Sequence, residues 1–165
     1  MSFLSRLSPS FVVAVLGLVG IVSLAFALIG QYGFDLRPCV LCLYQRVPYG
    51  VMIAVCALAL LAVRRSEAAM RWTIVLCALL MVVGGGIAFY QAGVEQHWWA
   101  GPDGCSGTGI LDVEKLQLEN LFDAPPPARC DEIPWALFGL SLAAWNTLFS
   151  FAVAAGSVLY LKVRR

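Results

Sequence analysis

Two cysteines and an arginine stand close together in residues 38–46, whose sequence is PCVLCLYQR. If Cys39 lies near the start of a helix, Cys42 follows one turn later and Arg46 one turn after that, so the three side chains share roughly one face. A thiolate at this position is stabilised by the dipole at the helix N-terminus and by the guanidinium, and both make the sulfur more reactive. The spacing therefore indicates a reactive, redox-active pair of thiols.

Two less reactive interpretations of the same motif are a structural disulfide and part of a zinc site. A zinc site would need further ligands, such as a second Cys-x-x-Cys or a pair of histidines. The chain has no second Cys-x-x-Cys motif and only 1 histidine. These counts disfavour zinc and leave the structural disulfide open.

The composition shows what kind of protein carries this motif. Of the 165 residues, 61% are hydrophobic and 13% are charged, and the mean hydropathy is +0.83. A soluble domain of this size cannot bury so many apolar side chains, so the composition indicates an integral membrane protein.

Four apolar stretches predict an all-α membrane protein, a four-transmembrane-helix bundle that forms a single domain over residues 1–165. The predicted spans are about residues 11–29, 43–63, 72–90 and 135–161, each long enough to cross the hydrocarbon core as a helix. The first stretch could also be a signal peptide, but it exceeds the usual length of a signal-peptide apolar region, and further spans follow it. Pro134 is expected in the first turn of the fourth helix.

Basic residues predict how this bundle is oriented. Lysines and arginines gather in three patches near one set of helix ends, whereas most acidic residues lie in the alternate loops. By the positive-inside rule the patches face the cytoplasm, so both termini are cytoplasmic and the loops of about residues 30–42 and 91–134 lie outside. The patches are Arg6, then Arg64, Arg65 and Arg71, then Lys162, Arg164 and Arg165.

The 6 cysteines divide according to this topology. Cys56 and Cys77 lie within apolar runs and are interpreted as small buried hydrophobic residues. The other cysteines lie in the two outside loops, where disulfides can persist. Two such pairs can relay electrons by thiol–disulfide exchange from a soluble thiol to an acceptor at the membrane. The pairs are Cys39 with Cys42 and Cys105 with Cys130.

The acceptor of such a relay should be an apolar two-electron oxidant dissolved in the bilayer, and a quinone has these properties. Arg46 would contact it, because an arginine in or at the membrane is costly and is therefore a candidate for function. Its guanidinium can donate to a quinone carbonyl and stabilise the charge that develops on reduction. The alternative is an ordinary interface arginine whose guanidinium extends into water.

The second outside loop differs in character from the rest of the chain. Cys105 lies among glycines in a segment that another protein can reach, and Cys130 precedes the fourth span closely enough to lie near the first cysteine pair. Apolar residues gather on one side of residues 110–122, which predicts a short helix on the membrane surface. Packing of this helix against the outer ends of the spans is the alternative.

Residues 39–46, the four predicted spans and a second loop with Cys105 and Cys130 resemble the DsbB family of inner-membrane thiol:quinone oxidoreductases. Residues 130–135 and 138–141 also resemble that family, so the resemblance covers essentially the whole chain. It implies a disulfide-generating enzyme that crosses the bacterial inner membrane several times, with its termini in the cytoplasm and its cysteine loops in the periplasm.

The resemblance also implies a role for each loop cysteine. A reduced thioredoxin-fold partner, a DsbA-like protein, would attack Cys105 and form a mixed disulfide. Cys130 would be released and would pair transiently with Cys39, which leaves Cys42 as a thiolate facing ubiquinone or menaquinone with Arg46 beside it. The Cys39–Cys42 disulfide would re-form as the quinone is reduced.

The sequence departs from the family pattern at two places. Many members have a histidine at the top of the third span, where this chain has Gln91 or Ala92. The only histidine, His97, lies beside two tryptophans and is interpreted as an interface residue, with a quinone contact or proton donor as the alternative. Gln45 stands where an acidic residue is common.

Two other kinds of protein share parts of this pattern. A vitamin K epoxide reductase-like enzyme also combines four spans, a Cys-x-x-Cys motif and a quinone, but in that family the motif lies on the last helix and follows the loop cysteines. A tetraspan protein without catalytic activity could use a loop disulfide as a permanent structural link.

Overall fold

The computed structural model describes residues 6–62, 66–102 and 129–164. These residues form four long helices, α2 (Pro9–Gly33), α3 (Val40–Ala62), α4 (Glu67–Glu95) and α5 (Leu142–Val163). Each of the four is long and apolar enough to cross a membrane. The predicted fold class, an all-α four-helix membrane bundle, is therefore confirmed, whereas the short surface helix predicted at residues 110–122 lies outside the described residues.

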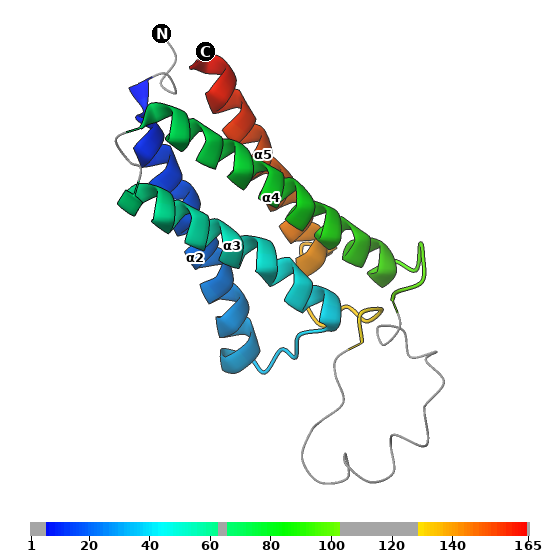
Figure 1. The fold of residues 1–165 in the computed structure, drawn as a ribbon. Coiled ribbons are helices and arrows are strands. Elements are labelled where there is room, and N and C mark those ends of the chain that lie inside the picture. The colour runs from blue at the N-terminus through cyan, green and yellow to red at the C-terminus, as the bar shows by residue number, and fades with distance from the viewer. Residues whose placement is uncertain (1–5, 63–65, 103–128, 165) are drawn as a thin grey trace.

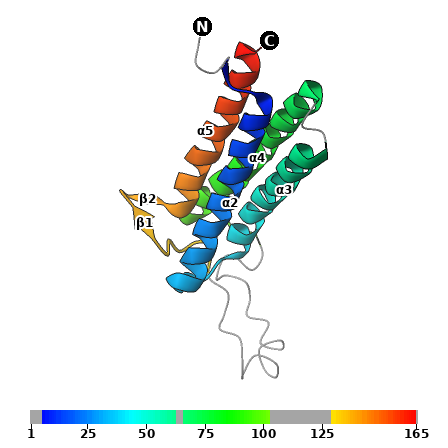
Figure 2. The same cartoon turned by 90° about the vertical axis from the view of Figure 1, so that its left-hand side faces the viewer.

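The helices run side by side. The start of α2 and the end of α5 lie at the same end of the bundle (Figures 1 and 2). α4 contacts each of the other three helices, and α2 packs against α3 as well. α4 therefore lies where residues from the other spans can meet it, which matters for the site at its C-terminal end.

The interior of the bundle is filled by methionine and cysteine side chains together with aliphatic residues and two tyrosines. Met52, Ile74 and Met81 are fully buried, and the prediction that Cys56 and Cys77 are buried is confirmed. Small residues let the backbones approach one another in a membrane protein. At Gly85 an added Cβ would lie 3.2 Å from the Cβ of Ser150, so this glycine is needed for the contact between α4 and α5.

The helix boundaries differ from the predicted spans, most clearly at the start of α5. The prediction that Pro134 opens the fourth helix at about residue 135 is wrong, because α5 begins at Leu142 with Ser141 as its N-cap. The intervening residues form a hairpin of β1 (Ala136–Leu137) and β2 (Leu140–Ser141). Phe138 and Gly139 both have positive φ, 53° and 80°, as a tight hairpin turn with the twist of its strands requires. This hairpin projects from the end of the bundle opposite the termini (Figure 2).

The other helices are longer than the predicted spans. α2 continues to Gly33 and α3 already begins at Val40, so the first outside loop is shorter than the predicted residues 30–42. α4 covers Glu67–Glu95 rather than residues 72–90. Polar residues at the helix ends continue the backbone hydrogen bonding after the apolar run has ended, and an apolarity criterion misses these turns.

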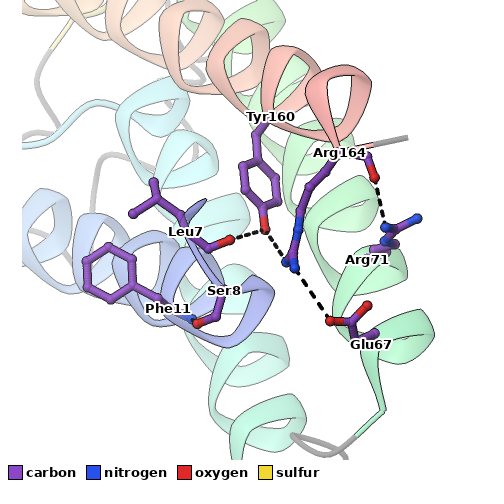
Figure 3. Close-up of polar contacts among 7 residues, drawn as sticks. All are labelled: Leu7, Ser8, Phe11, Glu67, Arg71, Tyr160 and Arg164. Atoms are coloured by element: carbon purple, nitrogen blue, oxygen red, sulfur yellow. Dashed lines mark hydrogen bonds and ion pairs between the residues drawn. The ribbon is translucent and has the colours of Figure 1, made fainter. Parts of the chain in front are cut away.

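A cluster of polar contacts joins three helices at the end of the bundle that carries the termini (Figure 3). The Tyr160 hydroxyl on α5 donates to the Leu7 carbonyl at 3.0 Å and accepts from Arg164 at 3.1 Å. Arg164 also lies 3.5 Å from Glu67, and Arg71 donates to the Arg164 carbonyl at 2.9 Å. These contacts fix the chain before α2, the start of α4 and the end of α5 relative to one another.

Candidate redox site

Cys39 and Cys42 lie at the N-terminus of α3, as their spacing predicts. The Cys42 backbone N–H donates to Cys39 Sγ at 3.3 Å, and the Leu43 N–H donates to the Cys39 carbonyl at 3.2 Å. Cys39 therefore acts as the N-cap, a position where a side-chain acceptor satisfies a free N–H of the first turn. Pro38 favours a helix that starts after it, because a proline disfavours the helical conformation for the residue before it, Arg37.

The two sulfurs of the motif are free thiols 2.7 Å apart. A disulfide bond is about 2.05 Å long, so the pair can be oxidised with only a small movement of the side chains. Cys39 is buried, with 3% of its surface exposed. Its hydrogen bond with Cys42 and its burial raise the pKa of the Cys39 thiol, so Cys39 keeps its proton and a single negative charge on the pair resides on Cys42.

Gln91 on α4 lies against Cys42. Its amide Nε2 donates to Cys42 Sγ at 3.3 Å, and its Oε1 accepts a hydrogen bond from Gln45 Nε2 on α3. Gln91 and Gln45 are both buried. Gln45 and Gln91, both named in the sequence analysis for their difference from the family pattern, thus contact each other, and Gln91 also contacts the Cys42 sulfur.

The hydrogen-bonded side chains continue from Gln45 into α5. Asn146 donates to Gln45 Oε1 at 2.6 Å and accepts from the Tyr49 hydroxyl at 2.6 Å, while Tyr49 lies 3.1 Å from Ser150 Oγ. Asn146 therefore bonds to another helix, as a polar side chain in the middle of a membrane span usually does. The sequence did not reveal the other members of this network, although a glutamine, a tyrosine and a serine within apolar spans are the signal that marks such contacts.

Glu95, in the last turn of α4, is a further residue of this site that the sequence did not indicate. Its side chain is 5% exposed, and Oε1 accepts from Gln91 Nε2 at 3.1 Å. Gln91 therefore donates to Cys42 and to Glu95 with the same amide group. Because Glu95 follows an apolar run in the sequence, it looks like one of the exposed acidic residues of the second loop.

Arg46 extends toward α2 instead of toward α4. Its Nη1 donates to Gln31 Oε1 at 2.6 Å, and Gln31 lies in the last turns of α2. Arg46 lies one turn beyond Cys42 as predicted, and no ion pair of Arg46 with a carboxylate occurs within the described ranges. Its guanidinium therefore keeps donors for another oxygen.

Cys130 packs against the first cysteine pair. It is 1% exposed, participates in a disulfide bond and belongs to one buried cluster with Cys39, Leu41 and Val94. The predicted partner in that disulfide, Cys105, lies outside the described residues. Beside Cys130, the exposed Arg129 forms ion pairs with Asp131 at 2.9 Å and with Glu132 at 3.5 Å.

Two hollows adjoin the motif. A small cavity of about 150 Å³ is open to both sulfurs and to Gln91, and charged residues from both loops line its rim: Arg37, Arg129 and Glu132. An apolar groove of about 640 Å³ runs between α3 and α4 on the face turned to the lipid. Leu41, Tyr44 and Tyr90 line this groove, and each neighbours a residue of the redox site in the sequence.

His97 lies in the turn after α4, with a positive φ of 58° and an exposed side chain. Its backbone N–H donates to the Val94 carbonyl at 3.0 Å. Trp98 and Trp99 follow it and contact the ring of Phe89 with centroid distances of 6.4 and 5.8 Å. This aromatic cluster at the helix end is typical of a membrane interface and agrees with the interface interpretation of His97.

Four membrane-spanning helices with a dithiol at the N-terminus of one span, and a further cysteine packed against it, define a membrane-embedded disulfide oxidoreductase. The family model described as Disulfide bond formation protein DsbB matches residues 9–160, so the chain belongs to the DsbB family. This assignment confirms the resemblance seen in the sequence and favours it over the vitamin K epoxide reductase-like alternative.

Several curated proteins of this family are similar over most of their length. Disulfide bond formation protein B of Dechloromonas aromatica (strain RCB) is 32% identical over 150 residues, which cover 87% of this chain and 86% of the relative. Its counterpart in Polaromonas sp. (strain JS666 / ATCC BAA-500) is 28% identical over 162 residues, covering 95% and 94% of the two chains. That of Acinetobacter baumannii (strain ATCC 17978) is 29% identical over 154 residues, covering 87% and 85%.

Proposed function

We propose that the protein is a thiol:quinone oxidoreductase that reoxidises a periplasmic DsbA-like dithiol protein and passes the electrons to ubiquinone or menaquinone in the membrane. The observation that supports this most directly is the arrangement of three cysteines. Cys39 and Cys42 have their sulfurs 2.7 Å apart at a helix N-terminus, and Cys130 packs into the same buried cluster.

The first exchange takes place in the second loop. A thiolate of the reduced partner attacks Cys105, and the Cys105–Cys130 disulfide breaks as a mixed disulfide forms. Cys130 leaves as a thiolate. The second thiol of the partner then attacks the mixed disulfide, so the partner leaves oxidised and two electrons remain on the Cys105–Cys130 pair.

The second exchange takes place at the start of α3. The Cys130 thiolate attacks Cys39 in the oxidised Cys39–Cys42 pair, one disulfide bond forms as another breaks, and Cys42 leaves as a thiolate. The Gln91 amide donates to this sulfur at 3.3 Å and so stabilises its negative charge. When Cys105 then attacks Cys130, the second loop is reoxidised and Cys39 and Cys42 are left as the dithiol.

Oxidation of this dithiol releases two electrons and two protons, for which a bound quinone supplies the acceptor. The residues at the site fit such a molecule. Arg46 retains donors for a carbonyl oxygen, and Gln31 holds its guanidinium at 2.6 Å. The apolar groove beside Tyr44 and Tyr90 is open to the lipid and large enough for part of an isoprenoid chain.

The same proposal includes the orientation of the bundle. Arg71, Lys162 and Arg164 belong to the start of α4 and the end of α5, whereas Cys39 and the Cys130 that packs against it lie at the start of α3, at the opposite end of the bundle. By the positive-inside rule the basic end faces the cytoplasm, so the cysteines lie on the periplasmic side of the bacterial inner membrane. His97 is assigned to the interface there, with no part in the electron path.

A coupled assay tests this function. The purified protein is incubated with a reduced DsbA-like protein and a short-chain quinone, and thiol loss and quinone absorbance are followed together. We expect two thiols to be lost for each quinone reduced, with complete loss of activity in Cys42→Ser and retained activity in Cys56→Ala, a buried cysteine outside the site. Quinone that stays unchanged with the intact protein would instead support a tetraspan protein with a purely structural disulfide.

A further inference from the structure

Glu95 is a buried acid that the electron path described above does not use. Its side chain is 5% exposed, and its Oε2 has no hydrogen-bond partner among the described residues. Burying a polar atom without a partner costs free energy. A structural role as an acceptor for Gln91 would need only Oε1 and could be filled by a neutral residue.

Gln91 connects this acid to the reactive sulfur. Its Nε2 donates one hydrogen to Cys42 Sγ at 3.3 Å and one to Glu95 Oε1 at 3.1 Å. The two acceptors therefore share one amide group, and the negative charge of Glu95 acts directly against a negative charge on Cys42. An arrangement of this kind accommodates one negative charge more easily than two.

The other groups around Glu95 do not neutralise it. At the N-cap of α5 the neutral Ser141 hydroxyl interacts with the carboxyl group and carries no charge that would neutralise it. On the loop side Arg129 is paired with Asp131 and Glu132, and the imidazole of His97 acts on Asp131. Arg37 lines the adjoining cavity, but no ion pair to Glu95 is formed within residues 6–62, 66–102 and 129–164.

We propose that Glu95 is the proton acceptor for Cys42, and that the two side chains share one negative charge across the Gln91 amide. The exchange converts the Cys42 thiol and the Glu95 carboxylate into the Cys42 thiolate and the Glu95 acid. One proton moves from sulfur to oxygen, and the net charge of the buried site does not change. Glu95 acts here as a positioning and proton-holding residue, since it acts on the sulfur through Gln91. The inference deepens the proposed function, because it concerns the same thiolate.

A negative charge shared between Cys42 and Glu95 gives a pH dependence that a purely structural role of Glu95 would not give. Two coupled groups lose their protons in two macroscopic steps. The thiolate fraction of Cys42 should therefore rise with pH in two steps, separated by a plateau on which one charge is divided between sulfur and carboxyl group. With Glu95→Gln the acceptor for Gln91 is kept but the proton site is lost, so a single step should remain.

The test measures the alkylation rate of Cys42 by iodoacetamide as a function of pH, with the Cys42 peptide resolved by mass spectrometry. A Cys39→Ser background keeps a side-chain N-cap and leaves Cys42 as the only thiol of the motif. We expect the protein with Glu95 to show a plateau at least twofold below its alkaline maximum and the Glu95→Gln variant to show one step. Glu67→Gln, the same change at the other end of α4, should keep both steps.

A single step in the protein that retains Glu95 would overturn the proposal without reference to any variant. A profile of Glu95→Gln that superimposes on that of its parent would do the same. The measurement uses neither quinone nor partner protein. It can therefore support the role of Glu95 even if the coupled assay shows no quinone reduction, and it can contradict that role even if quinone is reduced.

Discussion

Among the described residues, the charged guanidinium of Arg46 donates a hydrogen bond only to an amide, Gln31 Oε1, at 2.6 Å. We expect Arg46→Ala to raise the quinone concentration needed for half-maximal activity on the order of tenfold or more, because a hydrogen bond from a charged donor contributes roughly 1.5–3 kcal/mol. Steady-state rates at varied quinone measure this effect. Trapping of the mixed disulfide at Cys105 should be unchanged.

Gln31→Ala provides a matched comparison, because it removes only the residue that holds the guanidinium. Its effect on the quinone requirement should have the same sign as that of Arg46→Ala and be smaller. Equal activity of the Arg46→Ala variant at limiting quinone would show that Arg46 makes no such contact and is an ordinary interface residue.

Single residues of the site were predictable where the chemistry is local. The position of Cys39 before the first turn and of Cys42 within it follows from a spacing of three residues after a proline. The contact between Cys42 and Gln91 joins residues 49 positions apart, and it depends on which faces of α3 and α4 meet. An amphipathic pattern would indicate those faces, but helices surrounded by lipid are apolar on every side.

The polar network between α3 and α5 shows how elements are held together inside the bundle. Asn146 joins the two helices through Gln45 and Tyr49. We expect Asn146→Leu to lower the free energy of unfolding by about 1 kcal/mol, as interhelical hydrogen bonds in membranes typically contribute. Unfolding in mixed micelles, followed by circular dichroism, measures the change.

Ser157→Ala is the control for that prediction, because the Ser157 hydroxyl donates at 2.8 Å to the Val153 carbonyl of its own helix. Its removal breaks no hydrogen bond between the described helices and should leave stability within about 0.5 kcal/mol. If the two variants were equally stable, Asn146 would not contribute to helix association.

The four long helices were predicted correctly as helices, but their first and last residues were predicted less accurately. All four spans followed from apolar length alone, but the start of α5 did not. A proline before an apolar run is typical of a first helical turn, and the two-residue strands of the β1–β2 hairpin are too short to show an alternating pattern. The Ser141 N-cap, whose Oγ accepts from the Ala144 N–H at 3.2 Å, was the better signal.

The whole molecule combines two asymmetries that the sequence already contained. Arg71 and Lys162 belong to the start of α4 and the end of α5, whereas Cys39 and Cys42 lie at the start of α3, at the opposite end of the bundle (Figure 1). The polar cluster of Tyr160, Arg164 and Glu67 fixes the basic end (Figure 3). The end that carries Cys39 and Cys42 is built around buried side chains of α3 and α4. An enzyme of the proposed kind, which would take electrons from a soluble protein, needs these cysteines on the side where that protein is present.

Orientation can be tested independently of activity. A reporter fused after Arg65 should read cytoplasmic, and one fused after Gly107 should read periplasmic, because Arg64, Arg65 and Arg71 resist transfer across the membrane. Alkaline phosphatase fusions, active only outside the cytoplasm, should be inactive at the first site and active at the second. The reverse pattern would place Cys39 and Cys42 in the cytoplasm, where thiols are kept reduced, and would remove the basis for disulfide formation by this chain.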